Sequence, residues 1–290
     1  ARNGVNTYDL LRTEKMPYSA GAYGRDERRG DYREDRRSLF ENNTDVMLDF
    51  SRTFNKIRVN VLGGGAVRTF KYTTNYASTD YLITPGVYNF ANSANPVRAF
   101  GYNANMLVTS GYYSADVTLN KYLTLSHTGR VDRISTLPTE NQTFFYPSLG
   151  FNSIVTEYVK LGPISLLKLR GAYANVKDGL TQSTIGAAGA SVLGYGENYS
   201  SVYNGPSYAN AEPYSTPLGY NNAPAAYYTN TLSNAALDRN SREEFELGAD
   251  IGLFKNMVNV EFTYFNVKEG PLIFARPISE TSGYTAQQVN

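Results

Sequence analysis

The chain of 290 residues has no cysteine, no tryptophan and a single histidine, His127. Without cysteine it has no disulfides and no thiolate metal ligands. With one histidine it cannot form a metal site that needs two histidines, or a Ser-His-Asp catalytic triad that is assisted by a second histidine. The 27 basic residues nearly balance the 26 acidic ones, which gives no reason to expect a nucleic-acid partner. We therefore expect no metal, no other cofactor and no nucleic acid.

Long apolar runs are also missing. The mean hydropathy is −0.40, and no run approaches the roughly 18 apolar residues that a transmembrane helix needs. A helical membrane protein is thereby excluded, whereas a membrane β-barrel needs an apolar residue only at every second position. Tyrosine is abundant, with 25 residues, and its apolar ring and polar hydroxyl suit the boundary between lipid and water.

Apolar and polar residues alternate in several segments, as they do in strands with one apolar face. The clearest segment places five apolar side chains on one face: Phe245, Leu247, Ala249, Ile251 and Leu253. A turn at 254–257 joins it to a second strand at 258–264. Three further hairpins are predicted, which pair 46–50 with 57–61, 113–119 with 122–132, and 146–156 with 166–173. Four hairpins give eight strands.

Three long polar segments, 1–43, 75–110 and 175–240, are predicted to be loops. The first contains a run of mixed charge at 25–37, which we interpret as a solvated loop with ion pairs. Short turns at one end of the strands and long loops at the other are typical of outer-membrane barrels. We expect an all-β fold, a transmembrane antiparallel β-barrel domain over 1–290, with these loops on the extracellular side and the short turns on the periplasmic side.

The alternation also predicts which side chains line the interior of the barrel. The charged residues expected to face the lumen and a plug are Asp116, Arg130, Asp132, Lys168, Arg170, Glu246, Asp250 and Glu261. His127 falls among the lipid-facing positions, where a neutral histidine in a groove, or a shift of register, is a better interpretation than a proton-transfer site. Gly63-Gly-Gly65 lacks the Gly-Lys-Ser/Thr of a phosphate loop, so it indicates a bend or a close backbone approach.

Several short strings resemble one family of transporters. They are Tyr122-Leu-Thr-Leu, Gly129-Arg-Val-Asp, Ser135-Thr-Leu-Pro138, Phe144-Phe-Tyr-Pro-Ser148 and Leu167-Lys-Leu-Arg-Gly-Ala-Tyr173. In this order they resemble the barrel of SusC/RagA-type TonB-dependent transporters, and residues 245–254 and 282–284 fit the same family. The resemblance covers about residues 110–290.

The resemblance implies a segment of a 22-stranded barrel that is filled by an amino-terminal plug. It also implies a TonB-contacting segment and a SusD-like surface lipoprotein that closes over the ligand, in the outer membrane of a Gram-negative, Bacteroidetes-like bacterium. The chain has no leader at its start and stops within an element, so we expect the middle of the barrel, without the plug, the TonB-contacting segment or the closing strand.

The function that the resemblance implies is TonB-dependent import of oligosaccharides or oligopeptides. Aromatic faces in the long loops would meet such ligands first, and the candidates are Tyr88, Tyr195, Tyr199 and Tyr203. The same tyrosines are equally compatible with contact to the lipoprotein or with packing between loops.

Two other classes of protein are alternatives to a transporter. A self-contained small barrel with an adhesive or structural role would have no plug. A secreted glycosidase would need two carboxylates about 5–10 Å apart in a cleft. Glu243 and Glu244 point to opposite faces of a strand, and Glu246 and Asp250 lie about 13 Å apart along one. We therefore predict that the chain is not an enzyme.

Overall fold

The structure is a computed structural model of the whole chain. It describes residues 1–17, 29–179, 181–184, 200–206, 210, 214–215, 226–228 and 230–290. Within these residues no helix combines the length and the apolar character needed to cross a membrane. The only helices among them are short 3-10 turns, and the rest is strand and connection.

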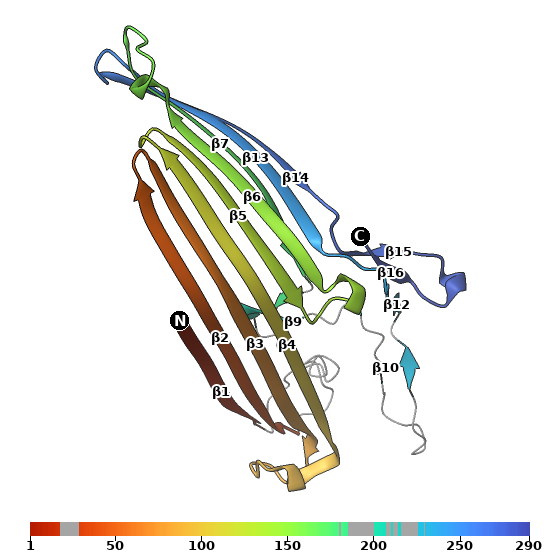
Figure 1. Cartoon of the computed structure of the whole chain (residues 1–290). Helices are drawn as coiled ribbons and strands as arrows, with labels where there is room; N and C mark the ends of the chain where they lie inside the picture. Colours follow the sequence, from red (N-terminus) through yellow and green to blue (C-terminus); the bar gives the residue numbers. More distant parts are fainter. Residues whose placement is uncertain are drawn as a thin grey trace.

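One curved antiparallel sheet of nine strands dominates the described part of the chain (Figure 1). Its strands follow the order β1-β2-β3-β4-β5-β6-β7-β13-β14. Their bounds are β1 Arg2–Met16, β2 Asp31–Phe54, β3 Ile57–Leu82, β4 Ser93–Leu119, β5 Leu123–Ile134, β6 Thr143–Ile154, β7 Ile164–Asp178, β13 Asn240–Leu253 and β14 Val258–Glu269. The expected all-β antiparallel architecture is confirmed.

Several short strands lie outside the main sheet. They are β8 Thr181–Thr184, β9 Ser200–Pro206, β10 Tyr214–Ser215, β11 Tyr227–Tyr228, β12 Thr231–Leu232, β15 Phe274–Pro277 and β16 Ala286–Val289. They pair as β8 with β9, as β10 with β11, and as the three-stranded sheet β12-β16-β15. All of them lie in the connection between β7 and β13 or after β14.

The four predicted hairpins are all present. The tight turns β2–β3, β4–β5 and β13–β14 contain residues with left-handed backbone, which asparagine tolerates better than most side chains. Asn55, Asn120 and Asn256 have φ of 55°, 49° and 65°. The fourth hairpin, β6–β7, turns through a 3-10 helix at Val155–Glu157. All four turns lie at the same end of the sheet (Figure 1).

Towards the turn end, sequence alternation places most of the large apolar side chains on the convex face of the sheet. Leu48, Leu149 and Phe262 are 79%, 56% and 63% exposed, as are similar residues on every strand from β2 to β14. An exposed apolar surface of this extent would be unstable in water but is the lipid-contacting surface of a membrane barrel. We call this side the outward face and the other the inward face.

Aromatic side chains cover three glycines of the sheet. A Cβ at Gly129 would lie 2.6 Å from the Tyr113 ring, one at Gly64 2.6 Å from the Tyr112 ring, and one at Gly171 2.3 Å from the Phe151 ring. Each ring lies over a neighbouring strand where a side chain would collide with it, and this covers backbone that glycine leaves bare. Within the predicted site of a bend or close backbone approach, 63–65, the group that lies closest is therefore the side chain of Tyr112 over Gly64.

The prediction of irregular loops at 1–43 and 75–110 is wrong as to their backbone. β1 and the first half of β2 occupy most of 1–43, and β3 and β4 fill 75–110 except for the connection around 83–92. β2, β3 and β4 have 24, 26 and 27 residues, although about 9–11 suffice to cross a membrane. Alternation disappears at this end of the sheet because the outward face becomes largely polar, whereas the inward face carries both charged and apolar side chains. Half of the third predicted loop, 175–240, lies outside the described residues, and the described half includes β8 to β12.

The mixed-charge run is also less solvated than predicted. Asp31, Arg33, Asp35 and Arg37 of β2 are all buried, at 5–6% exposure. The expected ion pairs are present: Arg37 Nη2 donates to Asp35 Oδ2 at 2.5 Å, and Arg33 Nε lies 2.8 Å from Glu14 Oε2. Burial raises the pKa of the nearby Tyr76 hydroxyl, although the Arg33 charge opposes this shift.

Two apolar clusters stabilise the loop end of the sheet. One contains Leu39, Phe70, Tyr72, Ala104 and Met106 on the inward side of β2, β3 and β4. The other joins the sheet to its connections through Ile134, Leu137, Phe144 and Leu237. The turn end has no such cluster among the described residues, so packing on the inward face is concentrated where the strands extend furthest.

The assignment of faces can be tested with one arginine at two positions. Leu149→Arg would place a charge in the middle of the outward apolar face, which should reduce stability by about 2–4 kcal/mol if that face meets lipid. Ser126→Arg, the matched control, would place it on the inward face opposite Asp116 and should be tolerated. Urea titrations of protein folded into lipid vesicles would measure both variants, and equal losses would contradict the assignment.

Candidate functional site: the inward and outward faces of the barrel wall

The register of the sheet places all eight predicted lumen residues on the inward face. Asp116 pairs with Ser126, Ser126 with Gly150, Gly150 with Ala172, and Ala172 with Glu246. Five of the other six predicted residues lie an even number of residues from one of these positions on the same strand, so their side chains point to the same face. The sixth, Glu261, pairs with Asp250. The chain therefore carries a polar wall on one side and an apolar wall on the other. Which molecules face the polar wall is a separate question.

Arg170 on β7 is the centre of the larger inward cluster. Its Nη1 donates to Asp250 Oδ1 at 3.0 Å, and its Nη2 donates to Glu261 Oε1 at 2.6 Å and to Thr263 Oγ1 at 2.7 Å. Glu246 Oε1 lies 3.8 Å from its Nε. One guanidinium thus connects three adjacent strands and partly neutralises three carboxylates.

Lys168 completes this group. Its Nζ lies 3.6 Å from Asp250 Oδ2, so each carboxylate oxygen of Asp250 has a basic partner. With two cations and three carboxylates, the group of Lys168, Arg170, Glu246, Asp250 and Glu261 has a formal charge of −1. It offers carboxylate oxygens to hydrogen-bond donors that approach from the inside.

A second inward cluster lies on β2, β4, β5 and β6. Arg130 Nε donates to Asp132 Oδ1 at 2.8 Å, and its Nη2 donates to Ser110 Oγ at 2.9 Å. Tyr146 donates its hydroxyl hydrogen to Asp132, and the Arg130 guanidinium lies 5.9 Å from the centre of the Tyr112 ring. Arg130 and Asp132, both predicted as lumen residues, are therefore partners. Asp116 lies apart from both clusters.

The predicted lumen set missed members of these clusters. Tyr112 donates to Asp45 of β2, which adds two polar groups to the inward face. Asp45 alternates with Val46 and Leu48, so its inward direction could have been found from the sequence. The pairing of Asp45 with Tyr112 could not, because the two residues are 67 positions apart and meet only through the register of β2, β3 and β4.

The predicted ligand-contacting tyrosines are described unequally. Tyr88 lies in the connection between β3 and β4, partly exposed, with Lys15 Nζ 5.9 Å from the centre of its ring. Tyr203 belongs to β9, of which only the backbone is described here. Tyr195 and Tyr199 lie outside the described residues. The structure therefore does not place the four side chains in a common site.

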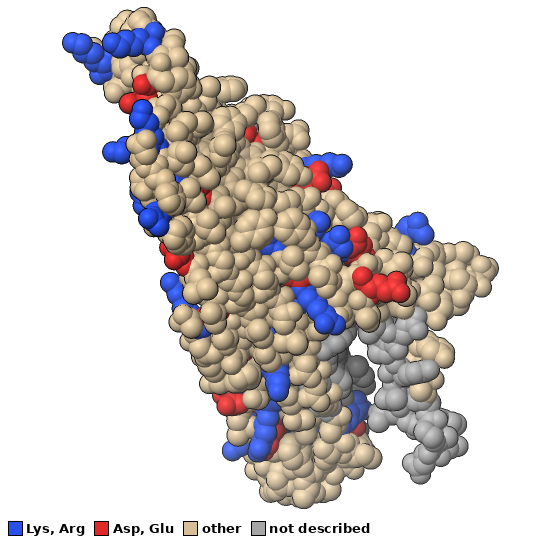
Figure 2. Space-filling view, viewed as in Figure 1, with Lys and Arg blue, Asp and Glu red and all other residues tan. Residues whose placement is uncertain are grey.

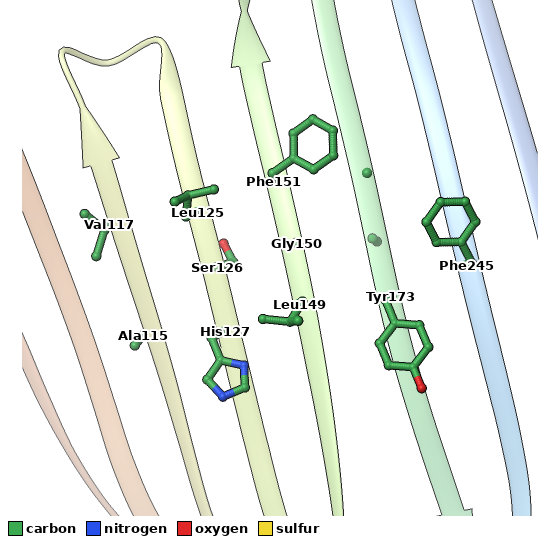
Figure 3. A pocket seen from close by; sticks show the side chains of 12 residues that line it. Ala115, Val117, Leu125, Ser126, His127, Leu149, Gly150, Phe151, Tyr173 and Phe245 are labelled. Atoms are coloured by element: carbon green, nitrogen blue, oxygen red, sulfur yellow. The ribbon is translucent and has the colours of Figure 1, made fainter.

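The outward face carries few charges. Figure 2 shows a broad surface of uncharged side chains, with lysine and arginine gathered towards its margins. It contains a groove of about 450 Å³ across β4, β5, β6, β7 and β13 (Figure 3). Apolar side chains form its walls, chiefly Val117, Leu125, Leu149, Phe151 and Phe245.

His127 lies in this groove at an outward position, without any shift of register. It pairs with Ala115 on one side and with Leu149 on the other. Its Nδ1 is 2.9 Å from the Ser148 carbonyl oxygen, which can only accept, so Nδ1 carries the hydrogen. Nε2 pairs with the Tyr113 hydroxyl at 2.8 Å. Both ring nitrogens are thus hydrogen-bonded within the groove, which agrees with a histidine in a groove and not with a shift of register.

Comparison with known proteins finds a curated relative and solved structures of similar fold. No family model matches the chain. TonB-dependent receptor P3 of Formosa agariphila is 23% identical over 268 residues, which cover 90% of this chain and 24% of that protein. The solved RagAB peptide transporter matches 99% of this chain with a TM-score of 0.77 at 14% identity. The RagAB peptide importer in its open-open state matches with a TM-score of 0.73 at 15% identity.

The chain has the fold of a SusC/RagA-type TonB-dependent transporter barrel. The resemblance seen in the sequence is thereby confirmed. The chain spans about a quarter of the length of the curated relative and 30% of the matched RagAB chain. Its nine-stranded sheet therefore corresponds to part of the wall of such a barrel, and the relatives are receptors and transporters.

The Arg170 cluster predicts a pH-dependent loss of stability. Arg170→Gln leaves three carboxylates on adjacent strands without their shared cation, so their mutual repulsion should lower the urea midpoint at pH 7. The loss should shrink as the pH falls towards about 4, where carboxyl groups take up protons and the repulsion ends. Urea titrations at several pH values would measure this.

Arg242→Gln is the matched control. Arg242 also has two carboxylate partners, Glu244 and Glu269, each at 3.3 Å, but this ion pairing is exposed to solvent and should contribute little. A loss for Arg170→Gln that is the same at every pH, or one no larger than that of Arg242→Gln, would contradict the role given to the cluster.

Proposed function

We propose that the full-length protein imports oligosaccharides or oligopeptides across the outer membrane in a TonB-dependent manner. The observation that supports this most is the two-sided wall, which is apolar outside and lined inside by hydrogen-bonded ion clusters. A polar inner wall of this kind suits a barrel that encloses a hydrated path or a folded plug. The relatives named above are a TonB-dependent receptor and peptide transporters, which is the same class of function.

The edges of the sheet support a larger barrel. β1 and β14 each pair with one neighbour in the sheet, and β14 carries an exposed apolar face. Backbone groups at an open edge would be unsatisfied in lipid, at a cost of several kcal/mol each. In this proposal the remaining strands of the full-length protein pair with both edges, and the domain over 1–290 is one sector of the closed barrel.

The inward ion clusters are proposed to contact the plug. Arg170, Lys168 and their carboxylates are only partly buried, so they have hydrogen-bonding capacity left for a partner. Arg130 and Asp132 are proposed to do the same further along the wall, together with the separate Asp116. Ion pairs that already satisfy one another within the wall can release a partner at low cost, which suits a plug that must move.

The long strands support the proposed orientation. Because β2, β3 and β4 are more than twice the length needed to cross the membrane, their loop ends extend well beyond it. We place this end outside the cell, with the segments 1–43, 75–110 and 175–240, and the four short turns in the periplasm. A SusD-like lipoprotein would cover this end, and TonB would act through segments outside this chain.

Import can be tested with cells that depend on the full-length protein for uptake. Peptides are the first ligands to test, because both RagAB structures concern a peptide transporter, and oligosaccharides are the second. Uptake of fluorescent oligopeptides should stop on deletion of the gene, on loss of TonB and on addition of a protonophore. Uptake that persists without TonB would indicate passive diffusion, and surface adhesion without uptake would favour the small adhesive barrel instead.

Tyr88 provides a test of ligand contact at the loop end. Tyr88→Ala removes an aromatic face that sugar rings or side chains could stack on, and should raise the apparent Kd for the imported ligand by roughly two- to tenfold. Tyr158→Ala is the control, since Tyr158 lies in the β6–β7 turn at the opposite end. Equal effects of the two changes on ligand binding by the purified protein would remove Tyr88 from the proposed site. Tyr195, Tyr199 and Tyr203 can be tested in the same way.

A further inference from the structure

The basic residues of the outward face form an ordered row. Beyond the apolar surface, towards the loop end, β3 carries Lys71, β5 carries Arg133, β7 carries Lys177 and β14 carries Lys268. Each occupies an outward position by the alternation of its strand. Residues on the turn side of each of them are mostly apolar.

The register gives the stagger of this row along the strands. Arg133 lies level with Val67 through their common partner Thr109, so Lys71 is four residues further along. When the position of Arg133 is carried across β6 to β7 by the register, Lys177 lies two residues nearer the turns than that position. When the position of Lys177 is carried across β13 to β14, Lys268 again lies two residues nearer the turns. From Lys71 to Lys268 the shift is eight residues over six steps between strands, or about 1.3 residues per step. Each residue rises about 3.3 Å along its strand, and neighbouring strands lie about 4.8 Å apart.

That shift corresponds to a strand tilt of about 43°, within the range of about 35–45° found in membrane barrels. Cations on differently staggered strands are therefore level along the barrel axis. On β5 the ten residues from Leu123 to Asp132, the one before Arg133, span a height of about 24 Å at this tilt. This agrees with the apolar band of about 25 Å expected around such barrels. The row marks the outer boundary of the lipid.

Two cations of the row lie above the groove. Arg133 and Lys177 flank β6 from either side. Arg133 Nε donates to Oε1 of Gln142, the residue before β6, at 3.2 Å, and Lys177 Nζ donates to the Phe145 carbonyl of β6 at 2.9 Å. Neither makes an ion pair with any described residue. The neighbouring outward carboxylate, Glu243, accepts from Asn175 at 3.2 Å.

The groove lies below these two cations on the same strands. His127 precedes Arg133 by six residues on β5, and Tyr173 precedes Lys177 by four on β7, which is about 13–20 Å along the strands. At the tilt above, this places the groove about half-way down the apolar band. An acyl chain whose headgroup lies at the row would reach this depth. Figure 3 shows the groove open between Ala115 and Val117 on one side and Tyr173 and Phe245 on the other, with Gly150 at its floor.

We propose that this part of the outward face binds one phosphate-bearing lipid of the outer leaflet. Arg133 and Lys177 hold its phosphate group, and the groove holds one acyl chain against Leu149 and Phe151. His127 contributes packing only, because both of its nitrogens are already paired. The proposal depends on the placement of the barrel in a membrane and not on import, so either can fail without the other.

The test uses the full-length protein in detergent and native mass spectrometry. The probes are phosphatidic acid, phosphatidylcholine with the same acyl chains, and inorganic phosphate. Near an anionic surface one cation is worth about a fivefold change in affinity, so Arg133→Gln with Lys177→Gln should weaken retention of phosphatidic acid about 30-fold. Ala115→Phe, which fills the groove without a change of charge, should also weaken it.

Lys71→Gln with Lys268→Gln is the matched control, because it removes the same charge from the same row away from the groove. Retention by this variant should stay within about twofold of the unchanged protein. An equal loss in the control would show a general effect of charge. Equal retention of phosphatidylcholine would show apolar contact alone, and competition by inorganic phosphate would show a free-anion site. Each of these results, or unchanged retention in both test variants, would overturn the proposal.

Discussion

Backbone hydrogen bonding in a medium without water is the constraint on which this structure depends. Inside lipid each N–H and C=O group must find a partner within the protein, and an antiparallel sheet satisfies them through neighbouring strands. The nine-stranded ladder from β1 to β14 does this with continuous register and two local irregularities, between Ser78 and Asp80 and between Gly252 and Leu253. Once the ladder exists, successive side chains alternate strictly between lipid and interior.

The same alternation separates two kinds of chemistry on one strand. On β7 the inward side chains Lys168 and Arg170 take part in an ion cluster, while the outward Leu169 and Tyr173 contact the apolar surroundings. Charges on the inward face are shared among strands, so one arginine serves three carboxylates. On the outward face both ring nitrogens of His127 are paired, and Arg133 lies at the boundary.

Beyond the membrane the constraint relaxes, and the strands change character without ending. β2 continues from the lipid-facing Val46 to the buried pair of Asp35 and Arg37 with its hydrogen-bonded ladder intact. What changes is the environment of each face: water replaces lipid outside, and packed connections cover the inside. Long strands with charged interiors at the loop end are thus the continuation of the same wall. In the proposed transporter, this extension carries the binding region away from the membrane.

The sequence by itself determined the class of fold, the four hairpins and the inward direction of the eight predicted residues, because a period of two assigns each side chain to a face wherever one face is apolar. It failed at 1–43 and 75–110, where the outward face is largely polar and strands look like loops. Only the tertiary structure decided which side chains meet: Arg170 with three carboxylates, Asp45 with Tyr112, and the level row of cations that includes Arg133 and Lys177. These contacts depend on register and tilt across up to seven strands, and no local pattern encodes the stagger between strands far apart in the chain.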